Sequence, residues 1–67
     1  MKNSAFLHGA HVWMGERGDN GEKWYIVGPK GFLRGGGSVW DKYPVQGTFI
    51  ADSREKADHA LQVLLNE

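Results

Sequence analysis

Two histidines lie close together near the start of the chain, in the sequence His8-Gly9-Ala10-His11. Imidazoles at this spacing can share a metal ion when the segment is helical, because positions three apart then lie on one face. Gly9 and the strand-forming residues that follow argue against a helix here. The spacing supplies no third ligand, and a chain without cysteine excludes a cysteine-based zinc site. We therefore expect no metal site.

A second candidate pair is Glu55 and His59, which are four residues apart and would touch on a helix. This pair falls on the solvent-facing side of an expected C-terminal helix, where such contacts are weak. The serines, Ser4, Ser38 and Ser53, lack the surrounding pattern of a nucleophile elbow. With no recognisable catalytic constellation, we expect a protein that is not an enzyme and binds no cofactor.

The segment 28–38 is the part of the chain best suited to anion binding. It is rich in glycine, which exposes backbone N–H groups, and Lys30 and Arg34 add positive charge. It matches neither a P-loop nor a dinucleotide fingerprint, because no strand-loop-helix context follows it. The aromatic residues within and after it are Phe32, Trp40 and Tyr43. A basic loop with aromatic neighbours is typical of a surface that contacts nucleic acid or an acidic protein.

The charges are distributed unevenly along the 67 residues, although the formal net charge is zero. The cations of the basic segment 23–42 are Lys23, Lys30, Arg34 and Lys42, against the single acid Asp41. Such a split steers an anionic partner, but four cations are few beside the footprint of a dedicated nucleic-acid-binding protein. Ordinary solubilising charge on loops is the alternative explanation.

The composition favours a cytoplasmic location. The absence of cysteine suits a reducing compartment. The residues before His8 include too few apolar ones for the core of a signal peptide. The longest apolar run, 24–27, is far shorter than the roughly 20 residues that a membrane span needs. We expect no membrane contact.

Short runs of strand-forming residues alternate with turn residues over the first 51 positions. The expected extended segments are 10–16, 22–27, 32–34, 39–40 and 48–51. The sequence Gly-Asp-Asn-Gly at 18–21 predicts a tight hairpin between the first two. The sequence Gly-Pro-Lys-Gly at 28–31 predicts a further turn.

A helix is predicted from Ser53 to the last residue of the chain. Residues 52–55 have the spacing of a capping box, in which an oxygen-bearing side chain is followed three positions later by glutamate. Neither glycine nor proline follows. The apolar stripe of the helix is expected to contain Ala57, Ala60, Leu61, Leu64 and Leu65. Its solvent side is expected to carry Glu55, His59, Gln62 and Asn66.

These elements predict a single α+β domain, residues 1–67. It contains a small, mostly antiparallel sheet of three to four strands, with one C-terminal helix packed on one face. Because side chains alternate along a strand, Trp24 and Ile26 face one side of this sheet and Tyr25 and Val27 face the other. Both sides are therefore apolar, and one helix covers only one of them.

The second sheet face needs a different cover. The candidates are the N-terminal segment 5–7, the loop around Trp40, a second copy of the chain and a foreign partner. If the chain does not cover this face itself, an exposed aromatic patch remains, and such patches mark interaction sites on soluble proteins.

Three tryptophans are many for a chain of this length, and tryptophan is common both in small cores and at binding hot spots. We expect Trp24 in the core and Trp40, beside the glycine-rich loop, as a contact residue. The predicted partner-binding residues are Lys30, Phe32, Arg34, Trp40, Lys42 and Tyr43.

In general form the chain resembles the small orphan accessory proteins of bacteriophages and mobile elements. The resemblance rests on a hairpin strand at 23–27, a later strand at 48–51 and a capped helix beginning at 53–57. It implies a protein that binds and blocks a host or defence component.

Three functional hypotheses follow. The first is a non-enzymatic protein-binding module, acting as an inhibitor in the sense that the resemblance implies. The alternative is a small nucleic-acid-binding accessory domain that uses the basic aromatic loop. The third is a homodimer whose paired sheet faces have a purely structural role. Nucleic-acid binding should weaken steeply as salt rises, because phosphate contacts release counterions, whereas a hydrophobic protein interface should not.

Overall fold

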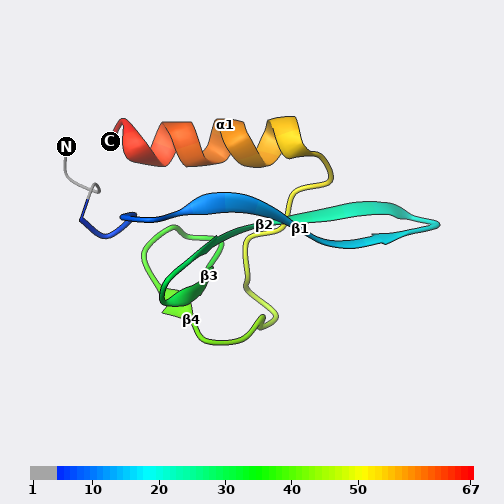
Figure 1. Ribbon diagram of the computed structural model, residues 1–67, viewed down its shortest axis with the longest axis horizontal. Helices are drawn as coiled ribbons and strands as arrows, with labels where there is room; N and C mark the ends of the chain where they lie inside the picture. Colours follow the sequence, from blue (N-terminus) through cyan, green and yellow to red (C-terminus); the bar gives the residue numbers. More distant parts are fainter. Residues whose placement is uncertain (1–4) are drawn as a thin grey trace.

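The computed structural model describes residues 5–67 and contains four strands followed by one helix (Figure 1). The elements are β1 His11–Gly18, β2 Gly21–Gly28, β3 Gly31–Leu33, β4 Trp40–Asp41 and α1 Arg54–Leu65. The strands form one antiparallel sheet in the order β1-β2-β3-β4. The predicted α+β class, with a small antiparallel sheet and a C-terminal helix, is confirmed.

Two tight turns connect the first three strands, as the sequence predicts. Gly18 pairs with Gly21 at the end of the first hairpin, and Gly28 pairs with Gly31 at the end of the second. Gly31 has a φ of +120°, and a Cβ there would collide with the backbone of Asp41. Only glycine therefore allows β4 to approach β3 this closely.

Strand β1 contains a bulge that the sequence analysis did not anticipate. Met14 is opposite Trp24 but Glu16 is opposite Lys23, so Gly15 is an extra residue without a partner in β2. A bulge shifts the pairing register by one residue. Side chains before Gly15 therefore lie on the sheet face opposite to the one that the hairpin turn alone would predict.

The prediction of a last strand at 48–51 is wrong. Thr48 and Ala51 each form an isolated bridge, to Arg34 and to Trp24 respectively. The physical reason is that this segment crosses between two strands instead of following one. It pairs with the end of β3 first and then with the middle of β2, so no continuous ladder forms.

Helix α1 begins one residue later than the capping-box spacing suggests. Ser53 is the N-cap, and its side-chain oxygen accepts a hydrogen bond from the N–H of Lys56 at 3.2 Å. Asp52 instead forms an ion pair with Lys56, at 2.9 Å between Oδ1 and Nζ. The helix therefore has a simple serine cap without a reciprocal glutamate contact.

The core lies between α1 and one face of the sheet. Figure 1 shows α1 running alongside the β1–β2 hairpin. The buried cluster contains Leu7, Ile26, Leu33 and Leu61. Partly buried residues packed around it are Phe6, Ala10, Val12, Trp40, Phe49, Ala60, Leu64 and Leu65. The predicted apolar stripe of the helix is confirmed, and the four residues expected on its solvent side are exposed.

Candidate functional site

The sheet face opposite the core carries a group of aromatic rings. Residues paired across neighbouring strands share a face, and Trp13 is paired with Tyr25 while Val27 is paired with Phe32. Tyr25 and Val27 also share a face, because they are two residues apart in β2. We call the surface formed by Trp13, Tyr25, Val27 and Phe32 the aromatic face.

The three rings of the aromatic face contact one another. The ring centroids of Tyr25 and Phe32 are 5.4 Å apart, and their planes are nearly perpendicular. The ring centroid of Trp13 lies 6.1 Å from the ring centroid of each of these two residues. Such offset and edge-on arrangements are the favoured geometries of aromatic pairs. The rings therefore form one continuous apolar surface across three strands.

This surface is partly exposed to solvent, because Tyr25, Val27 and Phe32 are half-buried. Trp13 is exposed, with 47% of its surface accessible to solvent. A groove of about 300 Å³ lies beside its ring, between β1 and the second turn. The groove is lined by His11, Trp13, Val27, Gly28, Gly31 and Phe32.

Gly15, the bulge residue, leaves room for the rings of Tyr25 and Trp13. A Cβ at this position would overlap with the ring of Tyr25 and would come within 2.9 Å of the Trp13 ring. Both rings therefore pack against the backbone of β1 at Gly15. Only the hydrogen of a glycine fits between this backbone and the rings.

Ion pairs border the aromatic face at both ends. At the end nearer the first hairpin turn, residues 18–21, Lys23 Nζ lies 3.3 Å from Glu16 Oε1. At the other end, Arg34 binds Asp41 through two hydrogen bonds, 3.0 Å from Nε to Oδ2 and 2.7 Å from Nη2 to Oδ1. An apolar centre with a polar rim is the usual anatomy of a protein interface.

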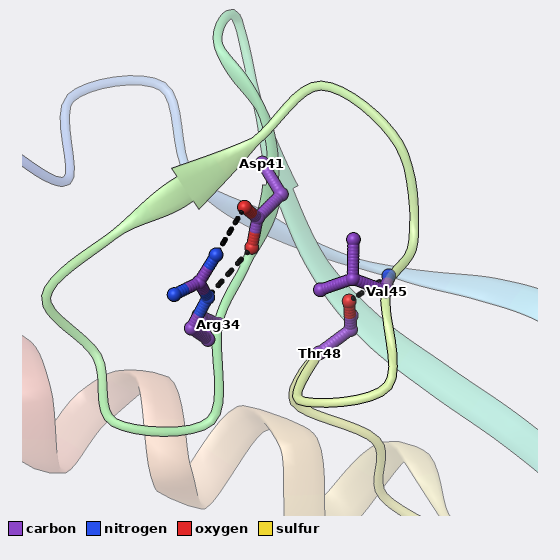
Figure 2. A network of polar contacts seen from close by, with 4 residues as sticks. All are labelled: Arg34, Asp41, Val45 and Thr48. Atoms are coloured by element: carbon purple, nitrogen blue, oxygen red, sulfur yellow. Dashed lines mark hydrogen bonds and ion pairs between the residues drawn. The ribbon is translucent and has the colours of Figure 1, made fainter.

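The Arg34–Asp41 pair changes the expected role of Arg34. Hydrogen bonds from the guanidinium hold the pKa of Asp41 below its ordinary value, and the same bonds raise the pKa of Arg34. Both donors of the pair are directed at the carboxylate (Figure 2). Arg34, predicted to bind an anionic partner, is therefore already neutralised within the chain.

The glycine-rich loop is anchored to the rest of the chain. The N–H of Gly35 donates to the carbonyl of Gly47 at 2.7 Å, and the N–H of Gly37 donates to the carbonyl of Arg34 at 2.8 Å. The hydroxyl of the buried Thr48 accepts from the N–H of Val45 at 2.7 Å (Figure 2). The N–H groups of Gly35 and Gly37 are therefore already engaged within the chain.

Trp40 packs on the core side of the sheet, away from the aromatic face. Its indole N–H donates to the carbonyl of Phe6 at 3.0 Å, and the two rings lie 5.7 Å apart. Neither the N-terminal segment around Leu7 nor the loop around Trp40 therefore covers the aromatic face. Trp40 is half-buried there and lines, together with Lys30, a cavity of about 210 Å³, so its role as a contact residue stays a prediction. Trp24, expected in the core, is half-buried.

The remaining predicted contact residues lie at three places. Phe32 belongs to the aromatic face. Lys30 lies exposed in the second turn, and Lys42 stands 5.7 Å above the ring of Tyr43, which is 67% exposed. Among the described residues, no acidic group forms an ion pair with either lysine. The structure thus does not bring the six predicted residues together into one surface.

A larger, shallow groove of about 590 Å³ lies between the hairpin end and the start of α1. Its charged groups already have partners. Glu22 accepts hydrogen bonds from the indole N–H of Trp24 and from Arg17, which lower its pKa. Lys56 is paired with Asp52. This groove offers no unsatisfied charge to a ligand.

Residues 5–67 contain no group of three or more metal-ligating side chains. His11 Nδ1 lies 3.1 Å from the carbonyl oxygen of Gly9. The hydroxyl of Ser53 serves as the helix cap. Ser4, the first serine considered as a nucleophile, lies outside the described residues. In the same part of the chain, no helix has the length and apolar character that crossing a membrane requires.

Three residues of the aromatic face, Trp13, Tyr25 and Val27, were not among the contact residues predicted from the sequence. The turn at 18–21 would place Trp13 opposite Ile26, on the core side, if β1 were regular. The bulge places it opposite Tyr25 instead. A glycine inside a strand is the signal that marks such a bulge, and Gly15 supplied it.

No family model matches the chain, and comparisons with curated proteins and with solved structures found no similar protein.

Proposed function

We propose that this chain is a non-enzymatic protein-binding module and that its contact surface is the aromatic face. The observation that carries the proposal is the contiguous ring group of Trp13, Tyr25 and Phe32 on a sheet face that lies opposite the core. Tryptophan and tyrosine are enriched among the residues that dominate binding energy. A soluble domain that displays such a surface uses it for contact.

The charges around this face support a protein partner over a nucleic acid. Two of the four cations in the basic segment, Lys23 and Arg34, are paired with Glu16 and Asp41. Neutralised cations contribute little to phosphate binding, because they release few counterions. The centre of the face is uncharged, as in the middle of protein interfaces.

The partner class is a protein with an exposed apolar side chain that enters the groove beside Trp13. The role as an inhibitor of a host or defence protein is part of the proposal. This finer role is supported by the general resemblance to phage accessory proteins.

The test compares two threonine variants of matched exposure. Trp13→Thr removes a ring from the aromatic face, whereas Ile50→Thr changes a residue that is 49% exposed and lies outside it. Threonine keeps the strand preference at position 13. The tagged chains are used for capture from bacterial lysate, with and without nuclease treatment and at low and high salt, followed by quantitative mass spectrometry and nucleic-acid staining. The captured protein is then purified and titrated against each variant.

We expect a discrete protein that is retained at high salt by the wild type and by Ile50→Thr. Its affinity for Trp13→Thr should fall by about 30-fold, as for a hot-spot residue worth about 2 kcal/mol. Capture of nucleic acid with a steep salt dependence would contradict the proposal. So would a partner that binds both variants equally.

A further inference from the structure

The outer edge of β1 has unpaired backbone groups. Strand β1 is at one end of the sheet order, so only its inner edge faces another strand. The N–H of Trp24 donates to the carbonyl of Ala51 at 2.8 Å, and the N–H of Ala51 donates back at 2.9 Å. Both backbone groups of Trp24 thus point away from β1, and Met14, opposite Trp24, is not bonded to it.

The pair Val12–Ile26 in the β1–β2 ladder is also without hydrogen bonds between its two residues. In an antiparallel ladder, bonded and non-bonded pairs alternate, so Val12 and Ile26 also form a non-bonded pair. The N–H and C=O groups of Val12 and Met14 are therefore directed outward. Among residues 5–67, no backbone hydrogen bond outside the regular strands engages these groups. Proteins usually protect such an edge with lysine or proline, and neither is present between His11 and Met14.

We infer that β1 pairs with β1 of a second copy of this chain, antiparallel and about a two-fold axis at Trp13. This register places Val12 opposite Met14 of the copy and Met14 opposite Val12 of the copy. Each pair exchanges two hydrogen bonds, so all four outward groups on each chain find a partner. The inference stands on the edge of β1 and does not depend on the proposed function.

Other registers of the regular part of β1 satisfy fewer groups. An axis at Val12 places Met14 opposite Ala10, whose N–H already donates to the carbonyl of Leu7 at 2.9 Å. An axis at Met14 places Val12 opposite Glu16, which lies beyond the bulge and is paired with Lys23 of its own chain. The axis at Trp13 is therefore the register for which a second copy is self-complementary.

The same register brings the two aromatic faces together. Trp13 and Trp13 of the copy form a non-bonded pair, the type in which opposing side chains are closest. Both rings lie on the aromatic face, so the half-exposed Trp13 ring gains an aromatic neighbour. His11 is opposite Gly15 of the copy, and no like charges meet across the axis. The dimer would have one continuous sheet with a doubled aromatic face.

Cysteine scanning tests this register, because the chain has no cysteine of its own. The single variants are Val12→Cys, Trp13→Cys and Met14→Cys. Each tests a different position of the two-fold axis, because a cysteine meets its own copy only when the axis passes through that residue. Val63→Cys, on the helix, is the control, because Val63 is 46% exposed and Trp13 is 47% exposed. Non-bonded pairs have Cα atoms about 4.5 Å apart, within the range of a disulfide. Covalent dimer formation under mild oxidation is followed on non-reducing gels.

We expect Trp13→Cys to form covalent dimer about tenfold faster than the other three variants, since only this register aligns the two thiols. Analytical ultracentrifugation of the wild type should show a concentration-dependent mass approaching twice the 7.5 kDa of one chain. Met14→Pro removes an outward N–H and no bond to β2, so it should abolish the dimer while circular dichroism shows a folded sheet.

The inference is overturned by a wild-type mass that stays at one chain up to about 1 mM. It is also overturned if Trp13→Cys forms covalent dimer no faster than Val63→Cys, or more slowly than Val12→Cys or Met14→Cys. If Met14→Pro does not fold, the cysteine series and the wild-type mass decide. A protein captured through the aromatic face by a monomeric chain would leave the proposed function intact while excluding this dimer.

Discussion

The ring of Tyr25 lies directly over the backbone of Gly15, so that a Cβ at position 15 would occupy the space of the ring. This contact joins two features that are separate in the sequence. The bulge at Gly15 turns Trp13 onto the aromatic face, and the missing side chain leaves room for the Tyr25 ring.

Gly15→Ala should destabilise the protein by about 1–3 kcal/mol, as overpacking does in tightly filled sites. The added methyl group must displace the Tyr25 and Trp13 rings. Urea unfolding measures the effect, and near-ultraviolet circular dichroism reports the rings. Gly18→Ala in the same strand is the control, because a Cβ there meets nothing within 4 Å. Equal stability of the two variants would show that the rings do not lie on Gly15.

Asp41 should contribute stability that depends on pH. Its pKa is held below the ordinary value of 3.8, mainly by hydrogen bonds from Arg34. A carboxyl group whose pKa is lower in the folded state stabilises the fold above its unfolded pKa, and this contribution is lost as pH falls through the folded pKa. The stability difference between wild type and Asp41→Asn should therefore shrink as pH falls below about 4.

Urea midpoints of both proteins from neutral pH downward measure this difference. Glu22→Gln should behave in the same way, because the N–H of Trp24 and the guanidinium of Arg17 lower the pKa of Glu22. A difference between wild type and Asp41→Asn that stays constant down to the lowest pH would contradict the ion pair.

Trp40→Ala should destabilise the fold by about 2–4 kcal/mol, since it empties a space against the core and leaves the carbonyl of Phe6 without its donor. Trp13→Ala should have a smaller effect, about 1 kcal/mol, because Trp13 is half exposed. Urea unfolding of both variants gives the comparison. If Trp40→Ala is as stable as the wild type, then Trp40 is a surface residue and the sequence-based expectation was right.

Ser53→Ala should lower the free energy of unfolding by about 1 kcal/mol, because it removes the oxygen that caps α1. Asp52→Ala should lower it by less than about 0.5 kcal/mol, because it removes only an exposed ion pair with Lys56. Thermal or urea unfolding distinguishes the two. The reverse order would mean that Asp52 is the cap, as the capping-box spacing suggests.

Features with local causes could be predicted from the sequence. The hairpin at 18–21 follows from turn residues that stand between two strand-forming runs, and the structure confirms it. The apolar stripe of the helix, from Ala57 to Leu65, follows from the spacing of its apolar residues, because residues three and four apart lie on the same face of a helix. The opposite orientation of Ile26 and Tyr25 follows from simple alternation along β2.

Features with partners far along the chain could not be predicted in this way. Trp40 stands beside a glycine-rich segment, which suggested an exposed contact, yet its partner Phe6 is 34 residues away. Arg34 looked like a free cation because its distance from Asp41 in space is not visible in the sequence. Thr48 and Ala51 have strand-forming neighbours but bridge two different strands.

By itself, the sequence determined the α+β class, the two turns, the capped helix and the presence of two apolar sheet faces. Each of these features depends on residues that are close to one another in the sequence. Only the tertiary structure decided which aromatic residues stay open. One extra residue at Gly15 moves Trp13 from the core side to the aromatic face, and long-range packing draws Trp40 inward. Side-chain direction reverses with every single residue of register, so this choice depends on how the strands pair.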